Sequence, residues 1–190
     1  MVEKNLGKSS HPVSPGGPAG AIIIGGHINA LGVLRALASK GVACVVIRTK
    51  PYDMAHKSRF AAGYENALRL TEEPQSLIEI LEQRTREWQG WVLLTTCDEG
   101  MLAVSRWRDR LSEHFRVTAP AYEQALPMLD KERMLVVGRS AGLAAPRYYG
   151  VAGEIPETAG LEYPVVVKPF ESHRFQARFA AWKVICHSPP

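Results

Sequence analysis

Two apolar runs, separated by a glycine pair and one helical stretch, constrain the fold of this chain more than any other feature. The first run, Ala21–Ile24, is rich in β-branched residues and ends at Gly25-Gly26, which is typical of a buried parallel strand closed by a tight turn. The second run, Val42–Ile47, follows Gly41, a helix stop signal. This order predicts a βαβ unit. The predicted inner face of its helix comprises Ile28, Leu31, Leu34, Leu37 and Ala38.

The same alternation continues to about residue 120. Pro74 opens a second predicted helix, and Trp91–Leu94 indicates another strand. Asp98 suits the N-cap of a third helix, and Phe115–Val117 indicates a last strand. The alternation predicts an α/β fold over residues 19–120, a Rossmann-like parallel sheet with helices on both faces. The expected sheet-facing residues are Leu77, Ile78, Leu81 and Trp88 in the second helix and Met101, Val104, Trp107 and Leu111 in the third.

The chain differs in character on either side of this domain. Residues 1–18 are rich in Ser, Pro, Gly and Lys, which predicts a disordered tail. Residues 121–190 begin a second domain, in which Asp130 caps a helix that runs to Ala141. After a connection rich in Pro and Gly, Val165–Lys168 indicates a strand, and Phe179–Cys186 is expected to contain its hairpin partner.

Composition and charge disfavour several functional classes. The net charge of +4 comes without any block of Lys or Arg, so we expect no nucleic-acid partner. No apolar run approaches the ~20 residues of a membrane span, and residues 1–20 lack the apolar core of a secretory signal. Three widely spaced cysteines fit neither a disulfide framework nor a zinc site, and Cys44 is expected to be a reduced core thiol. We therefore expect a cytoplasmic protein.

The glycine pair after the first strand allows a ligand to approach the backbone at a helix N-terminus, where free N–H groups favour an anion. A dinucleotide fingerprint would require glycines where His27 and Ala30 stand. Arg48 ends the second strand in place of an acidic ribose partner, so a hypothesis of NADP binding stays open. A turn without any ligand is the simpler alternative.

Two lysines stand at the boundaries of predicted elements in the second domain. Lys131 opens the helix capped by Asp130, and Lys168 ends the strand that begins at Val165. A lysine held rigidly by a sheet is suited to meet a phosphate as a compact point charge. Taken singly, each lysine is equally compatible with an ordinary solvated side chain.

In combination, these features resemble the ATP-grasp superfamily. The motifs that resemble those of the superfamily follow one another in the same order along the chain: the glycine turn, Asp130-Lys131, Gly142–Pro146 and Pro164–Pro169. The resemblance extends over most of the chain. ATP-grasp enzymes join a carboxylate to an amine or similar nucleophile through an acylphosphate, with ATP and Mg²⁺. The resemblance implies that Lys131, Lys168, Ser172 and Arg174 bind ATP, and that Gly25 and Gly26 line a pocket for a small-molecule carboxylate.

The chain also departs from the ATP-grasp pattern. The segment Glu171–Arg178 contains no glycine, whereas many ATP-grasp enzymes have a Gly-rich loop there. The Mg²⁺ ligands of the family come from a later lobe, so we expect none of them in these residues. We also expect an incomplete ATP-grasp N-terminal lobe. These 190 residues alone are therefore not expected to catalyse ligation. The alternatives are a non-catalytic nucleotide or small-molecule binding module and an NADP-dependent Rossmann oxidoreductase.

Three further polar residues are candidates for substrate binding. His27 follows the glycine pair, Arg59 lies in the loop after the second strand, and Asp98 lies beyond the Trp91–Leu94 strand. Open α/β sheets bind ligands at the carboxyl ends of their strands. A turn residue and a helix cap are the simpler interpretations of His27 and Asp98. Cys97 is expected to pack rather than react, and exposed strand edges favour a homodimer.

Overall fold

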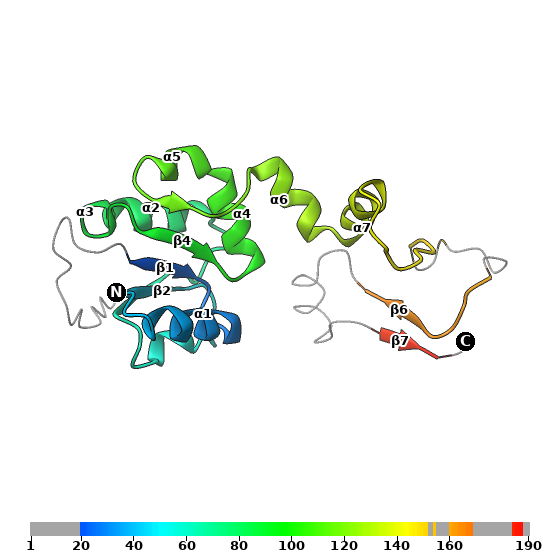
Figure 1. The fold of residues 1–190 in the computed structure, drawn as a ribbon, viewed down its shortest axis with the longest axis horizontal. Helices are drawn as coiled ribbons and strands as arrows, with labels where there is room; N and C mark the ends of the chain where they lie inside the picture. The colour runs from blue at the N-terminus through cyan, green and yellow to red at the C-terminus, as the bar shows by residue number, and fades with distance from the viewer. Residues whose placement is uncertain (1–19, 152–153, 155–159, 169–183, 188–190) are drawn as a thin grey trace. The chain divides into compact units, whose positions relative to one another are not determined.

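The computed structural model describes residues 20–151, 154, 160–168 and 184–187 (Figure 1). The chain divides into two compact units between Ala125 and Leu126, and each is described by itself.

The first unit is built on a five-stranded parallel sheet in the order β3-β2-β1-β4-β5. The central strand β1 aligns Ala21 with Cys44 of β2 on one side and with Val92 of β4 on the other. The predicted parallel sheet is thereby confirmed. The strands are β1 (Ala21–Ile24), β2 (Cys44–Arg48), β3 (Gly63–Asn66), β4 (Val92–Thr95) and β5 (Arg116–Val117).

Both faces of the sheet are covered, because every residue of β1 is buried. Ile22 and Ile24 join a core cluster with Leu77 and Val104, whereas Ile23 joins another with Leu34. Figure 1 accordingly shows α1 on one side of the sheet and α2, α3, α4 and α5 on the other. These helices are α1 (Ile28–Ala38), α2 (Gln75–Gln83), α3 (Thr85–Trp88), α4 (Asp98–Arg106) and α5 (Arg108–Ser112).

Four local predictions were wrong. The second predicted helix is divided at Arg84 into α2 and α3, so Trp88 lies on a separate helix from Leu77. The N-cap of α4 is Cys97, and Asp98 is the first helical residue without a capping role, because the extended backbone conformation lies at Cys97. The third predicted helix is divided at Trp107 into α4 and α5. Ile28 is 57% exposed, since it lies at the start of α1, beyond the edge of the sheet.

The order of the strands places a topological switch point between β1 and β4. From β1 the chain builds outward through β2 and β3, and it then returns to the other side of β1 to form β4 and β5. In open parallel sheets, ligands bind outside the carboxyl ends of the strands at such a point. The segments that follow β1, β2 and β4 are therefore the first place to look for a functional site.

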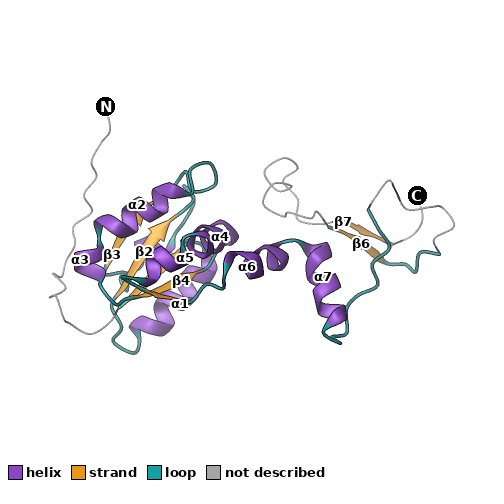
Figure 2. Ribbon diagram, turned by 90° about the horizontal axis from the view of Figure 1, so that it is seen from above, coloured by secondary structure: helices purple, strands orange, loops and turns teal. Residues whose placement is uncertain are grey.

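The second unit contains α7 (Lys131–Ser140) and a two-stranded antiparallel sheet (Figure 2). The Asp130 carboxylate accepts a hydrogen bond of 3.0 Å from the backbone N–H of Arg133, which confirms the predicted cap. Strand β6 (Val165–Val167) pairs with β7 (Val184–Cys186), which confirms the hairpin partner, and residues 179–183 lie outside the described residues. The helix α6 (Tyr122–Leu129), which includes Pro127, was not predicted and extends across the division between the units.

Among the helices that the structure describes, none has both the length and the apolar character needed to cross a membrane.

Candidate functional site

Three segments meet at the carboxyl edge of the sheet. Gly25-Gly26 follows β1, residues 49–53 follow β2, and residues 96–99 follow β4. Because β1 lies between β2 and β4, the glycine turn lies between the other two segments. The short helix η1 (Ala55–Lys57) follows directly after the segment that leaves β2.

Gly25 is in tight contact with the segment after β4. Its φ is +99°, and a Cβ atom at this position would lie 2.5 Å from Thr96 Oγ1 and 3.2 Å from Cys97 Sγ. Thr96 is itself fixed, because its N–H and its hydroxyl both donate to the carbonyl of Ile24, at 2.8 and 2.9 Å. Glycine is therefore required at position 25 by both the backbone conformation and the available space.

Gly26 is in equally tight contact with the loop after β2. A Cβ atom on Gly26 would lie 2.5 Å from the Cβ of Asp53, and the Gly26 carbonyl accepts hydrogen bonds of 2.8 Å from the N–H groups of Met54 and Ala55. The two glycines thus let two neighbouring loops approach the end of β1 from opposite sides.

Asp53 organises the loop after β2. Its side chain is only 3% exposed, and its Oδ2 accepts hydrogen bonds from the backbone N–H groups of Thr49 at 2.8 Å and Lys50 at 3.0 Å. A buried carboxylate is tolerated only with such donors. Asp53 was not among the residues selected from the sequence. The sequence Pro51-Tyr52-Asp53 is typical of a turn and could have indicated this residue. The contact of Asp53 with Gly26 could not be predicted, because it depends on the order of the strands.

An ion pair joins the segments on either side of β1. Lys50 Nζ lies 2.9 Å from Glu99 Oε1, and it also donates to Thr71 Oγ1 at 3.0 Å. Burial disfavours the charged form of Lys50, but the hydrogen bond and the negative charge of Glu99 outweigh that effect and raise its pKa. Lys50 is therefore a cation at neutral pH in the middle of this edge. Lys50 was not selected from the sequence as a site residue.

Cys97 is half-buried at the same edge. Its sulfur lies 3.9 Å from Thr49 Oγ1, and burial raises the pKa of its thiol to about 11. The thiolate is the nucleophilic form of cysteine. A thiol that stays protonated at neutral pH supports the expectation that Cys97 packs rather than reacts.

This property predicts slow alkylation of Cys97 in the folded chain. With a pKa of about 11, only about 0.1% of the thiol is ionised at pH 8, and the rate of modification by iodoacetamide should rise about tenfold per pH unit above that. Peptide mass spectrometry measures the modified fraction over time, with the chain unfolded in urea as the control. Equal rates for Cys97 in the folded and unfolded chains at pH 8 would contradict the assignment.

Comparison with known proteins identifies the fold. No protein-family model matches the sequence, and no curated protein matches it. The structure is similar to an L-amino acid ligase from Bacillus licheniformis, with a TM-score of 0.62, 14% identity, and 90% of this chain aligned to 38% of that one. It is also similar to an N5-carboxyaminoimidazole synthetase from Staphylococcus aureus complexed with ADP, with a TM-score of 0.60, 16% identity, and 90% of this chain aligned to 42% of that one.

A third similar structure is the biotin carboxylase domain dimer of the Hydrogenobacter thermophilus 2-oxoglutarate carboxylase, with MgADP, ADP and bicarbonate. Its TM-score is 0.55, its identity is 17%, and 88% of this chain aligns to 37% of that one. This chain has the fold of the N-terminal part of ATP-grasp enzymes. It spans about two fifths of the length of the structures that it matches.

The structure brings together some of the predicted substrate-binding residues. Gly25, Gly26, His27 and Asp98 all lie at the carboxyl edge, where His27 is exposed and its ring lies 6.0 Å from that of Tyr52. Asp98 is exposed at the start of α4.

Arg59 is placed differently. Its guanidinium lies over the ring of Phe60, 5.0 Å from the centroid, on the part of the chain that leads to β3. Three residues later, Ala62 donates a hydrogen bond to the carbonyl of Cys44 at the beginning of β2. Arg59 therefore lies on the return path to the amino edge of the sheet, and no described contact joins it to the glycine turn.

The predicted nucleotide-binding residues belong to the second unit. Lys131 is half-buried as the first residue of α7, and Lys168 is exposed directly after β6. Ser172 and Arg174, together with His173, lie outside the described residues. Their roles stay predictions.

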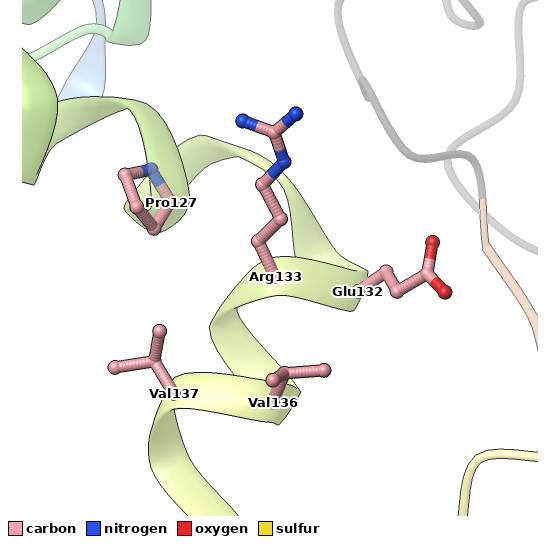
Figure 3. Close-up of a pocket in the computed structure, with 5 residues that line it drawn as sticks. All are labelled: Pro127, Glu132, Arg133, Val136 and Val137. Atoms are coloured by element: carbon pink, nitrogen blue, oxygen red, sulfur yellow. The ribbon is translucent and has the colours of Figure 1, made fainter. Parts of the chain in front are cut away.

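A shallow groove also lies along α7 (Figure 3). It is lined by Pro127, Glu132, Arg133, Val136 and Val137. Figure 3 shows the carboxylate of Glu132 and the guanidinium of Arg133 pointing in different directions from successive positions of the helix. Val136 and Val137 are 62% and 53% exposed, and the groove has no convergent set of polar groups of the kind that orients a small ligand.

Proposed function

We propose that this chain provides the substrate-binding domain and the first nucleotide-binding elements of an ATP-dependent ligase. The ligase would join a small-molecule carboxylate to an amine or a similar nucleophile. A carboxylate oxygen would attack the γ-phosphorus of ATP, giving an acylphosphate and ADP. The amine would then attack the acyl carbon, and phosphate and a proton would leave. In this proposal residues 19–120 bind the substrate and residues 121–190 begin the ATP-binding domain.

The observation that carries the proposal is the glycine turn at the switch point of a sheet with the ATP-grasp fold. Two glycines leave the backbone at the end of β1 without side chains, at the place where α/β sheets bind ligands. The loops after β2 and β4 flank this turn, so a ligand would contact groups from three segments.

The second unit carries two side chains that suit ATP. Two ammonium groups, on Lys131 and Lys168, suit the negative charge of phosphates, which phosphoryl transfer must neutralise. Within the described residues, no group of three or more His, Cys, Asp or Glu side chains is arranged to hold a metal ion. Mg²⁺ would supply further charge neutralisation when bound.

The alternatives receive different support. A non-catalytic nucleotide-binding module would use the same lysines, so binding experiments alone do not separate it from a ligase. An NADP-dependent oxidoreductase would need Arg48 for the 2′-phosphate, yet this guanidinium donates to Asn66 Oδ1 at 3.0 Å and to the Pro51 carbonyl at 3.1 Å. That engagement favours the ATP-grasp proposal over the oxidoreductase.

Calorimetric titration of the 190-residue chain with ATP tests the nucleotide-binding part of the proposal. We expect binding that weakens about tenfold in each of the variants Lys131→Met and Lys168→Met, because each removes a charge-assisted contact to a phosphate. The matched control is Lys40→Met, an exposed lysine just beyond the end of α1, which should bind ATP like the wild type. Absence of ATP binding, or equal weakening in all three variants, would contradict the assignment.

Two expectations from the sequence stay predictions. An assay for ADP release with carboxylates and amines checks whether the 190 residues alone are inactive. Light scattering during size-exclusion chromatography checks for a homodimer, an expectation that draws support from the dimer named for the similar biotin carboxylase domain.

A further inference from the structure

The Lys50–Glu99 ion pair crosses the end of the central strand. Lys50 lies two residues beyond β2, and Glu99 lies four residues beyond β4, while β1 separates these two strands. Neighbouring strands are about 4.8 Å apart, so a contact between these segments extends over about 10 Å of the sheet edge. The only strand end between them is that of β1, with its glycine turn. The ion pair therefore lies at the position where a ligand of the switch point would bind.

Lys50 retains the capacity to bind an anion there. An ammonium group has three donors, and Glu99 and Thr71 accept two of them. The Lys50 side chain is 30% exposed, whereas that of Glu99 is 13% exposed, so the cation is the more accessible member of the pair. An incoming oxygen anion can take the third donor without prior loss of the ion pair.

Exposed apolar side chains lie in the segments that follow β1 and β2. Ile28, Tyr52 and Met54 are 57%, 64% and 42% exposed, and each is within two residues of Gly26 or of its contact residue Asp53. Tyr52 also contributes to the electrostatic environment of Lys50. Exposed apolar side chains in segments that also carry a charged group are typical of a surface that binds a ligand with an apolar body and a polar group.

We propose that Lys50 binds the carboxylate of a substrate with an apolar body, and that Ile28, Tyr52 and Met54 cover that body. Glu99 holds Lys50 in position when no ligand is bound, and its negative charge opposes the incoming anion. This inference rests on the proposed function, because it names the class of carboxylate that the ligase takes. The opposite effects of the two charges on affinity distinguish a recognition role from a purely structural ion pair.

The probe is 3-phenylpropionate, titrated into the ¹⁵N-labelled 190-residue chain and followed by the amide signals of Gly25 and Gly26. We expect Lys50→Met to weaken binding about tenfold, since it removes a charge-assisted hydrogen bond. We expect Glu99→Gln to tighten binding about threefold, because it removes a like charge and keeps the shape. The matched controls are Lys40→Met, just beyond the end of α1, and Glu79→Gln, on α2; both residues are exposed, and both variants should leave the affinity unchanged.

Three further titrations separate the sources of affinity. The alcohol 3-phenyl-1-propanol, which lacks the charge, should bind at least about tenfold more weakly than the acid. Inorganic phosphate should bind more weakly than 3-phenylpropionate, and Tyr52→Ala should weaken the binding of the acid but not that of phosphate. Tighter binding of phosphate, or equal loss of affinity in Lys50→Met and Glu99→Gln, would overturn the proposal.

The outcome of the 3-phenylpropionate titrations is independent of the outcome of the ATP titrations. Loss of ATP binding with retention of the opposite effects at Lys50 and Glu99 would refute the ligase and leave the carboxylate site. ATP binding that depends on Lys168, without any response of Gly25 and Gly26 to 3-phenylpropionate, would refute the site and leave the ligase.

Discussion

Replacement of Gly25 by alanine is expected to lower the free energy of unfolding by about 4 kcal/mol. The positive φ of +99° makes a side chain at this position strained, at a cost of about 1–3 kcal/mol. The new Cβ would also lie 2.5 Å from Thr96 Oγ1, which cannot move away without losing its hydrogen bond to Ile24, and overpacking costs about 1–3 kcal/mol. Urea denaturation monitored by the fluorescence of the buried Trp88 and Trp91 measures the change.

Gly41 provides the matched control for this substitution. Its φ is +79°, but a Cβ atom there would meet nothing within 4 Å. Gly41→Ala should therefore show only the backbone cost, about 1 kcal/mol. Similar losses of stability in the two variants would show that the contact with Thr96 does not constrain position 25.

Replacement of Asp53 by alanine is expected to lower the free energy of unfolding by about 3 kcal/mol. The substitution leaves the backbone N–H groups of Thr49 and Lys50 without their acceptor, and each unsatisfied buried donor costs about 1–3 kcal/mol. The same denaturation experiment measures this loss. The amide signals of Gly26, Met54 and Ala55 should also shift, because the loop that contacts the glycine turn loses its organising carboxylate.

Two further variants define the cause. Asp53→Asn keeps an oxygen acceptor of similar shape, so it should recover most of the lost stability. Asp109→Ala removes a fully exposed aspartate and should change stability by no more than about 0.5 kcal/mol. A destabilisation by Asp53→Asn as large as that by Asp53→Ala would indicate that the negative charge, rather than the hydrogen bonds, holds the loop.

The parts of the fold that follow from local chemistry were predictable. The short β-branched run Ala21–Ile24 and the glycines after it indicated β1 and its turn, and Asp130 indicated the start of α7. Strand β3 was missed because Gly63–Asn66 has no apolar pattern, and its formation depends on pairing with β2 at the edge of the sheet.

The candidate site was only partly predictable, for a similar reason. The glycine turn is a local signal and was recognised. Lys50 and Glu99 are 49 positions apart, and their contact exists only because the chain places β2 and β4 on either side of β1. Asp53 is a buried carboxylate, and its position depends on two backbone donors and on the absence of a side chain at Gly26. Such contacts are properties of the tertiary fold, and propensity at a single position does not encode them.

The exposure of α7 affects how nucleotide affinity is to be understood. In this helix, all ten residues of which the structure describes, no side chain is buried, and a helix of this length is marginally stable in water without packing. The Asp130 cap, the backbone hydrogen bonds and the bond of Arg139 to the Pro146 carbonyl support it, and α7 is expected to open more readily than the sheet that holds β1. A ligand that needs Lys131 in place must supply the free energy that keeps α7 folded, so its measured affinity combines intrinsic contact strength with the conformational entropy lost by the helix.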